Sequence, residues 1–223
     1  MENEKFVTGV GSRAVEDAGT TNLIGKERVI EIAKLLDKAG YTLRSGGAYG
    51  CDSLFEQHMS KKEIYVPAPW FRTRPYNDEP ARKPTPFDIV GVSEEASRIA
   101  ESVHPAWKFL KDFPKKLHTR NVYQVLGKDL KHPSDLLVCW TNDGCNSEAT
   151  SSRDTGGTRT AIVLADRNGV PVFNLRNDKD YQMVKERLEK EIQQLFENNS
   201  QQNKGSLKIK KTGNSLDNTD TGR

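Results

Sequence analysis

The sequence predicts an α/β protein in which a parallel sheet carries helices on both of its faces, in three layers. Two patterns along the chain favour this class. Short apolar runs of strand length alternate with longer amphipathic segments of helix length. Glycine-rich loops follow several of the apolar runs, and such loops are typical of the point where a strand passes into a helix that contacts a ligand.

The first half of the chain predicts three strands and two helices. Residues 6–10, 41–43 and 63–66 are short apolar runs that we interpret as buried strands. The segment 22–39 places its apolar residues on one face of a helix, which Gly40 ends. A second helix is expected to begin near Cys51, after another glycine-rich loop.

Residues 66–92 predict an insertion with little regular structure. Six of the ten prolines lie between 67 and 88, and proline is excluded from helix interiors and central strands. Two interpretations are open: an irregular loop that packs on the body, or a lid that stacks on a base or holds a phosphate. The aromatic and arginine residues that suggest a lid are Trp70, Phe71, Arg72, Arg74, Tyr76, Arg82 and Phe87.

The second half repeats the alternation of helix and strand. Helices are predicted over 93–103, 117–130, 157–168 and 181–197, and strands over 136–140 and 170–173. Residues 1–197 are therefore expected to form one Rossmann-like domain. The polar residues 198–223 are expected to be a disordered tail, because they cannot bury enough apolar surface to fold.

The composition argues against several classes of protein. The net charge is +3, but residues 198–223 hold five basic and two acidic residues, which leaves 29 of each in the body. A neutral body lacks the positive field of a duplex-DNA binder. The cysteines and histidines show no metal-ligand spacing, so no metal and no cofactor is expected. Because the chain has no long apolar run and no signal-peptide core, we expect no membrane partner and a cytoplasmic location.

The stretch 155–165 carries the clearest ligand signal. Gly156 and Gly157 allow close approach of the backbone, and the hydroxyls of Thr158 and Thr160 follow at the start of a helix, where free N–H groups favour an anion. The right-handed crossover rule brings this loop to the same sheet edge as the loops 11–13 and 45–47. Three converging glycine loops predict a nucleotide-sized ligand that bears a phosphate.

These motifs resemble the SLOG superfamily over roughly residues 5 to 175. The resemblance rests on Gly11-Ser12-Arg13, on the run from Ser45 to Asp52, and on Gly156-Gly157-Thr158 followed by Pro171-Val172-Phe173. The superfamily includes the DprA/Smf DNA-processing proteins and the Lonely Guy phosphoribohydrolases. The motifs are most similar to those of the DprA-like proteins found in bacteriophages, which implies a bacterial host cell.

The resemblance to the phosphoribohydrolases implies a role for Arg120. Their Met-His-x-Arg-Lys helix is similar to the segment 117–121, in which Arg120 takes the arginine position. The glutamate of their glycine loop is replaced here by Val163, so the usual carboxylate is missing. Glu56 or Asp52, on the helix after the other glycine loop, could supply a carboxylate from across the cleft. The catalytic candidates are therefore Glu56 and Arg120.

The remaining site candidates are expected to bind the ligand. Arg13 is interpreted as a phosphate clamp, because a planar guanidinium matches phosphate. Trp140, at the end of a strand, is expected in the core or in the wall of the pocket. The predicted ligand-binding residues are Gly11, Ser12, Arg13, Ser45, Gly46, Gly47, Ala48, Asp52, Asn121, Trp140, Gly156, Gly157, Thr158 and Thr160.

Three functions remain open. The first is a protein that binds, and sequesters or hydrolyses, a nucleotide or a nucleotide-derived molecule. The second, implied by the resemblance to DprA, is a single-stranded DNA-binding protein that acts in DNA processing or recombination. The third is a hydrolase of the nucleotide N-glycosidic bond that uses Glu56 and Arg120. A homo-oligomer is left open, and whether the protein is an enzyme is undecided.

Overall fold

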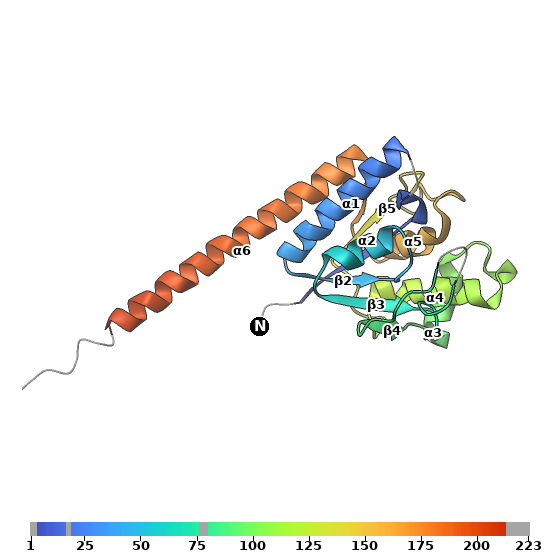
Figure 1. The fold of residues 1–223 in the computed structure, drawn as a ribbon, viewed down its shortest axis with the longest axis horizontal. Coiled ribbons are helices and arrows are strands. Elements are labelled where there is room, and N and C mark those ends of the chain that lie inside the picture. The colour runs from blue at the N-terminus through green and yellow to red at the C-terminus, as the bar shows by residue number, and fades with distance from the viewer. Residues whose placement is uncertain (1–3, 17–18, 76–79, 213–223) are drawn as a thin grey trace, which may run out of the picture.

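A six-stranded parallel sheet forms the centre of the computed structural model, which describes residues 4–16, 19–75 and 80–212. The strand order is β4-β3-β2-β1-β5-β6, and each pair of neighbours is parallel (Figure 1). The predicted three-layer α/β class is thereby confirmed. The strands are β1 (Lys5–Gly11), β2 (Tyr41–Ser45), β3 (Lys62–Val66), β4 (Asp88–Val90), β5 (Leu136–Trp140) and β6 (Val172–Asn174).

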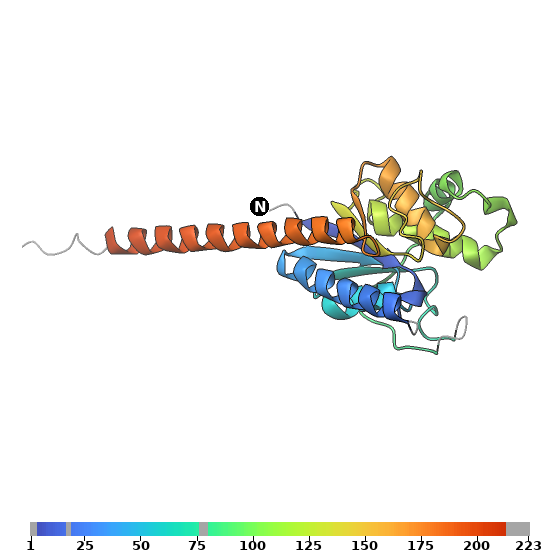
Figure 2. The same cartoon turned by 90° about the horizontal axis from the view of Figure 1, so that it is seen from above.

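Helices cover both faces of the sheet, as buried strands in an all-parallel sheet require. One face packs against α1 (Thr20–Lys38), α2 (Cys51–His58) and the first part of α6 (Asp178–Thr212). The other face packs against α3 (Glu94–Val103), α4 (Asp112–Leu126) and α5 (Arg159–Arg167). Each face has its own cluster of buried apolar side chains, and Figure 2 shows the two helical layers on either side of the sheet.

Several element boundaries differ from the predicted ones. The helix predicted from residue 117 begins at Asp112, because Pro114 lies in the first helical turn, where the missing N–H costs no hydrogen bond. It ends at Gly127, whose φ of 76° suits glycine. The helix predicted from residue 157 opens with a 3₁₀ turn, η3 (Gly156–Thr158), before α5. Two further 3₁₀ turns are η1 (Arg13–Glu16) and η2 (Trp107–Phe109).

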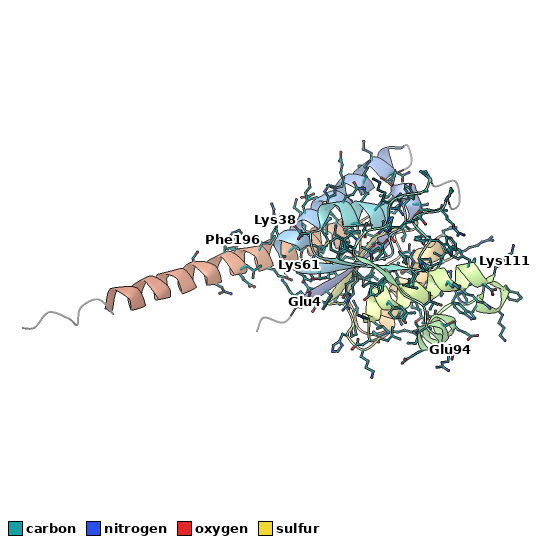
Figure 3. All side chains as sticks on the ribbon, turned by 60° about the horizontal axis from the view of Figure 1, so that its bottom comes forward. Glu4, Lys38, Lys61, Glu94, Lys111 and Phe196 are labelled. Carbon is teal, nitrogen blue, oxygen red and sulfur yellow. The ribbon has the colours of Figure 1, made fainter. Side chains whose placement is uncertain are left out.

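Helix α6 is longer than the predicted last helix. It continues as one helix to Thr212 and extends beyond the body of the protein (Figures 1 and 2). Phe196, 69% exposed, lies where α6 leaves the body (Figure 3). The tail was expected to be disordered from residue 198, whereas the structure carries helix through its first part; residues 213–223 lie outside the described residues. In the described part of the chain, no helix has both the length and the apolar character that a bilayer crossing requires.

The order of the strands creates a switch point between β1 and β5. From β1 the chain moves outward through β2, β3 and β4 on one side, and through β5 and β6 on the other. The crossovers on the two sides lie on opposite faces, so the loops after β1 and β5 diverge and leave a crevice at the carboxyl edge. Sequence-distant loops therefore meet at this place.

Candidate functional site

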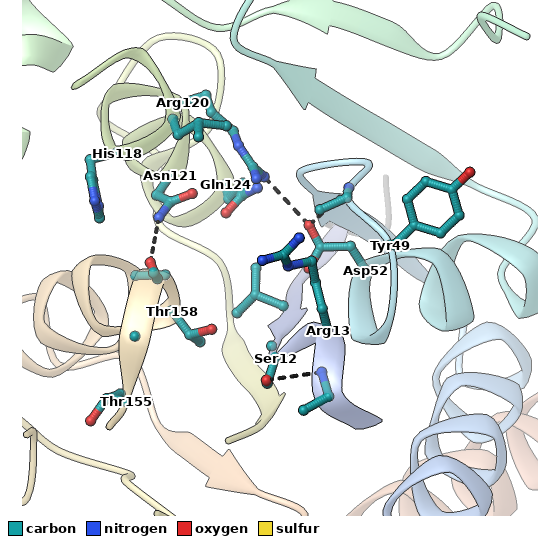
Figure 4. A pocket seen from close by; sticks show the side chains of 18 of the residues that line it. Ser12, Arg13, Tyr49, Asp52, His118, Arg120, Asn121, Gln124, Thr155 and Thr158 are labelled. Carbon is teal, nitrogen blue, oxygen red and sulfur yellow. Dashed lines mark hydrogen bonds and ion pairs between the residues drawn. The ribbon is translucent and has the colours of Figure 1, made fainter. Parts of the chain in front are cut away.

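A cleft of about 870 Å³ opens at the switch point. Its walls come from the turn after β1, the start of α2, one face of α4 and the loop before α5 (Figure 4). Phe71 and Pro80 of the proline-rich segment also line it. Ten of the predicted ligand or catalytic residues line it: Gly11, Ser12, Arg13, Ala48, Asp52, Arg120, Asn121, Gly156, Gly157 and Thr158. Six others do not: Ser45, Gly46, Gly47, Glu56, Trp140 and Thr160.

The turn after β1 is packed too closely for any side chain at Gly11. A Cβ there would lie 2.6 Å from the Trp140 carbonyl oxygen and 2.7 Å from the Cys51 sulfur. The Ser12 amide donates to the Trp140 carbonyl at 2.8 Å, which ties the turn to the end of β5. This packing sets the exposed Arg13 at the mouth of the cleft, and Figure 4 shows its side chain extending toward Asp52.

The second glycine loop accommodates arginine side chains. A Cβ on Gly46 would lie 0.9 Å from Nη1 of Arg120, and a Cβ on Gly47 would lie 2.7 Å from Nη2 of Arg72. Arg82 also donates to the Gly47 carbonyl. The glycines at 46 and 47 are therefore needed to admit guanidinium groups. The space beside the loop, which the sequence suggested for a phosphate, is filled by the protein itself.

Arg120 and Asp52 form a buried pair at the floor of the cleft. Nη1 of Arg120 lies 3.4 Å from Oδ2 of Asp52, and the two residues are 7% and 3% exposed (Figure 4). With its amide oriented so that the oxygen faces Arg120, Gln124 accepts from that guanidinium and, at 2.8 Å, from the Gly46 amide. Burial raises the pKa of Asp52, and the nearby Arg120 opposes this rise. Burial likewise lowers the pKa of Arg120.

The structure does not bring Glu56 to the cleft. Glu56 borders a separate hollow of about 230 Å³ beside Lys62 and Arg82. Both of its carboxylate oxygens accept from Nη2 of Arg72, at 2.9 and 3.0 Å. Nε of Arg72 lies 2.8 Å from Asp88, so this arginine ties the proline-rich segment to α2 and β4. The carboxyl group that lines the cleft together with Arg120 is Asp52.

The loop before α5 presents open backbone to the cleft. Gly156 has a φ of 64°, and neither it nor Gly157 would bring an added Cβ within 4 Å of another atom. Nδ2 of Asn121 donates to the Gly157 carbonyl at 3.1 Å, which holds the glycines against α4. Thr158 lines the cleft beside them. The exposed backbone of 156–157 at the start of a helix is the feature of the cleft best suited to an anionic group.

Asp143 organises the polar loop that leads to these glycines. Its carboxylate accepts from the hydroxyls of Thr141 at 2.8 Å, Ser152 at 2.9 Å and Thr155 at 2.5 Å. The amide of Cys145 donates to it at 3.2 Å. The many small polar residues of this loop thus hold one defined conformation, which sets the position of Gly156.

His118 lines the cleft, although the sequence did not indicate it as a site residue. Its Nδ1 lies 2.8 Å from the hydroxyl of Thr160, which is fully buried behind the cleft wall. Burial, with smaller contributions from nearby His104 and Arg120, lowers the pKa of His118 to about 4. His118 precedes Asn121 by three residues, so the two share one face of α4; that spacing was the signal available in the sequence.

Trp140 belongs to the core. It is 1% exposed, and a Cβ on Gly25 of α1 would lie 2.4 Å from its indole nitrogen. Of the two expectations for this residue, the structure places it in the core and not among the residues that line the cleft.

Several side chains of the described proline-rich segment contact the body. Trp70 stacks on Phe113 with ring centroids 4.9 Å apart, and Arg82 lies 4.2 Å from the ring centroid of Tyr49. The Tyr49 hydroxyl donates to the Pro80 carbonyl at 3.0 Å. Tyr76 lies outside the described residues. The segment therefore packs against the second glycine loop and reaches the border of the cleft.

Among residues 4–16, 19–75 and 80–212, no group of three or more His, Cys, Asp or Glu side chains is placed to hold a metal ion.

The chain shows little similarity to known proteins. No family model matches the chain, and no curated protein matches it. Among solved structures, the chain is similar to DNA processing protein A from Helicobacter pylori, described for its single-stranded DNA binding mode. The match has 16% identity, covers 82% of this chain and 81% of that chain, and has a TM-score of 0.33. At this level of similarity it carries no argument about function.

Proposed function

We propose that the cleft binds a nucleotide or a nucleotide-derived molecule and sequesters or hydrolyses it. The observation that carries the proposal is the pair Gly156 and Gly157, whose backbone faces open space at the start of α5. The start of a helix carries the positive end of its dipole, which favours a phosphate; the Gly156 amide itself donates to the Arg153 carbonyl at 3.2 Å. Arg13, on the opposite wall, supplies a guanidinium that matches phosphate geometry.

The position and size of the cleft support the same proposal. Ligands of open parallel α/β sheets bind at the carboxyl edge where the strand order reverses, which here is between β1 and β5. A volume of about 870 Å³ lies in the range of sites for small molecules and cofactors, roughly 300–1,000 Å³. Membership of the SLOG superfamily, with its nucleotide chemistry and a bacteriophage source, is part of this proposal and rests on the motifs named above.

The proposal is tested by thermal shift with nucleoside mono- and diphosphates, dinucleotides and cyclic nucleotides. A ligand at 100 times its dissociation constant stabilises the folded state by about 2.7 kcal/mol, which raises the melting temperature measurably. Gly157→Ala is the matched variant, because its methyl group enters open space and leaves the fold intact. We expect the shift to diminish in Gly157→Ala and to persist in Gln182→Ala, an exposed position on α6. If none of these compounds raises the melting temperature, the proposal is wrong.

Glycosidic-bond hydrolysis by Glu56 and Arg120 is the less favoured enzymatic form of the proposal. The two Glu56 oxygens are engaged by Arg72, whereas Asp52 lines the cleft beside Arg120. If a free base is released from a nucleotide, we expect Asp52→Asn to abolish the release and Glu56→Gln to leave it in place. The reverse pattern would restore the role first assigned to Glu56.

Single-stranded DNA binding is the second candidate, from a different class. The observation that favours it is Arg74, whose guanidinium lies 5.4 Å from the Trp70 ring, next to Phe71 at the border of the cleft. A strand would need such aromatic and basic groups along its path. Binding of an oligonucleotide that weakens steeply with salt, and that falls in Trp70→Ala, would support this candidate. Absent or salt-independent binding would exclude it.

A further inference from the structure

Thr160 fixes the hydrogen-bonding role of His118. The Thr160 side chain is fully buried, and a buried hydroxyl hydrogen needs an acceptor. Among the hydrogen bonds of the described residues, the Thr160 hydroxyl has one partner, Nδ1 of His118 at 2.8 Å. Because the hydroxyl hydrogen has this one acceptor, Nδ1 carries no proton of its own. The proton of the neutral ring then lies on Nε2.

The Nε2 edge of His118 is the edge that a ligand can reach. In the described chain, Nε2 of His118 makes no hydrogen bond. It is also not one of the buried polar atoms there that lack a partner, so it is open to solvent. His118 lines the cleft from α4, and Asn121, one turn further on, holds the Gly157 carbonyl (Figure 4). His118 therefore stands beside the exposed glycines at the start of α5.

We propose that His118 donates its Nε2–H to an acceptor oxygen of the ligand held at Gly156 and Gly157, and that Thr160 is the positioning residue that fixes this tautomer. This inference rests on the proposed function of the cleft. It adds His118 as a residue that contacts the ligand, and Thr160 as a residue that acts only through His118. It also limits the ligand: the atom next to His118 has to be an acceptor, such as a phosphoryl, carbonyl or hydroxyl oxygen.

The surroundings of His118 keep the ring neutral. The His104 ring packs against it from the end of α3, with centroids 4.3 Å apart. Arg120 on α4 disfavours a positive charge on His118, and Arg159 at the start of α5 does so for His104. Burial, the largest cause, together with these groups lowers the pKa of His118 to about 4. In the ligand-free protein His118 is thus uncharged across the range of pH 5.5 to 8.

The tautomer is measured directly by nitrogen NMR of the histidine rings in the full chain. His118 is assigned by the signal that is lost in His118→Gln. We expect protonated Nε2 and unprotonated Nδ1 from pH 8 to 5.5, and a mixture of both tautomers in Thr160→Val. A proton on Nδ1 in the wild type, or a titration midpoint near 6.5, would overturn the inference without any ligand.

Binding is then measured with adenosine 5′-monophosphate as the probe. The amide of Gln can place a donor near the Nε2 position, whereas Phe cannot, so His118→Gln should bind within about twofold of wild type. Loss of one uncharged hydrogen bond in His118→Phe should weaken binding about 5- to 10-fold, and Thr160→Val should weaken it by a smaller factor. Equal binding by wild type and His118→Phe would refute the contact. If the wild type binds neither this probe nor any other nucleotide, the proposed function fails, while the tautomer measurement still decides the role of Thr160.

Discussion

Gly46→Ala tests the interpretation that the second glycine loop is shaped for an arginine. The added Cβ would lie 0.9 Å from Nη1 of Arg120 and 2.1 Å from its Cζ, so the guanidinium has to move. It then leaves Asp52, which is 3% exposed, and Gln124, which accepts from it. Removing one partner of a buried ion pair costs about 3–5 kcal/mol. The separation of 3.4 Å is long for such a pair, so we expect a loss near the lower end, about 3 kcal/mol.

The matched control is Gly157→Ala, where nothing lies within 4 Å of the new Cβ. Both substitutions reduce the entropy of the unfolded chain alike, by an amount worth about 0.4–1 kcal/mol, so their difference isolates the clash with Arg120. The assay is urea unfolding followed by circular dichroism, with extrapolation to water. We expect Gly157→Ala to match or slightly exceed the wild type. A loss below about 1 kcal/mol in Gly46→Ala would refute the reasoning.

Three further predictions concern other parts of the site. In urea unfolding, Arg72→Met should cost about 3 kcal/mol, because it leaves the Glu56 and Asp88 carboxylates, whose side chains are 13% and 14% exposed, without their cation; a cost below about 1 kcal/mol would contradict this. Asp143→Ala should speed amide hydrogen exchange across residues 141–158, because four donors lose their acceptor, and unchanged exchange there would disprove its organising role. His118 has a pKa lowered from 6.5 to about 4, so the unfolded state binds more protons between these values and stability falls as pH drops through that window. The loss should reach about 3 kcal/mol near pH 4 and be missing in His118→Gln; equal pH profiles for the two proteins would refute it.

The fold could be predicted from the sequence because its signals are local. Strand-length apolar runs, an amphipathic helix that Gly40 ends, and glycine loops after strands each depend on neighbouring residues. The crossover rule fixes the hand of each connection and so the shared edge of the loops, but the strand order β4-β3-β2-β1-β5-β6 was not predicted. The short strand β4 was missed, because prolines precede it and its three residues at the sheet edge carry no period of their own.

The site was predictable only in part, because its contacts join residues far apart in the chain. The sequence places Gly46 and Gly47 in a loop of the phosphate-binding type, but it does not show that Arg120 and Arg72 fill the space beside them. In the same way, the sequence leaves Glu56 available as a catalytic group, whereas in the structure Arg72 of the proline-rich segment donates to both of its carboxylate oxygens. His118 was missed because its partner, Thr160, is 42 residues away.

The central claim is that the cleft between the turn after β1 and the start of α5 binds a nucleotide-derived ligand. Amide chemical-shift mapping with a series of nucleotides tests it most directly, because each backbone N–H reports on its own surroundings. We predict that the largest changes will fall on residues 11–13, 117–121 and 155–158. Changes that cluster instead around Glu56 and Arg82, or along residues 70–74, or that are absent for every nucleotide, would contradict the claim.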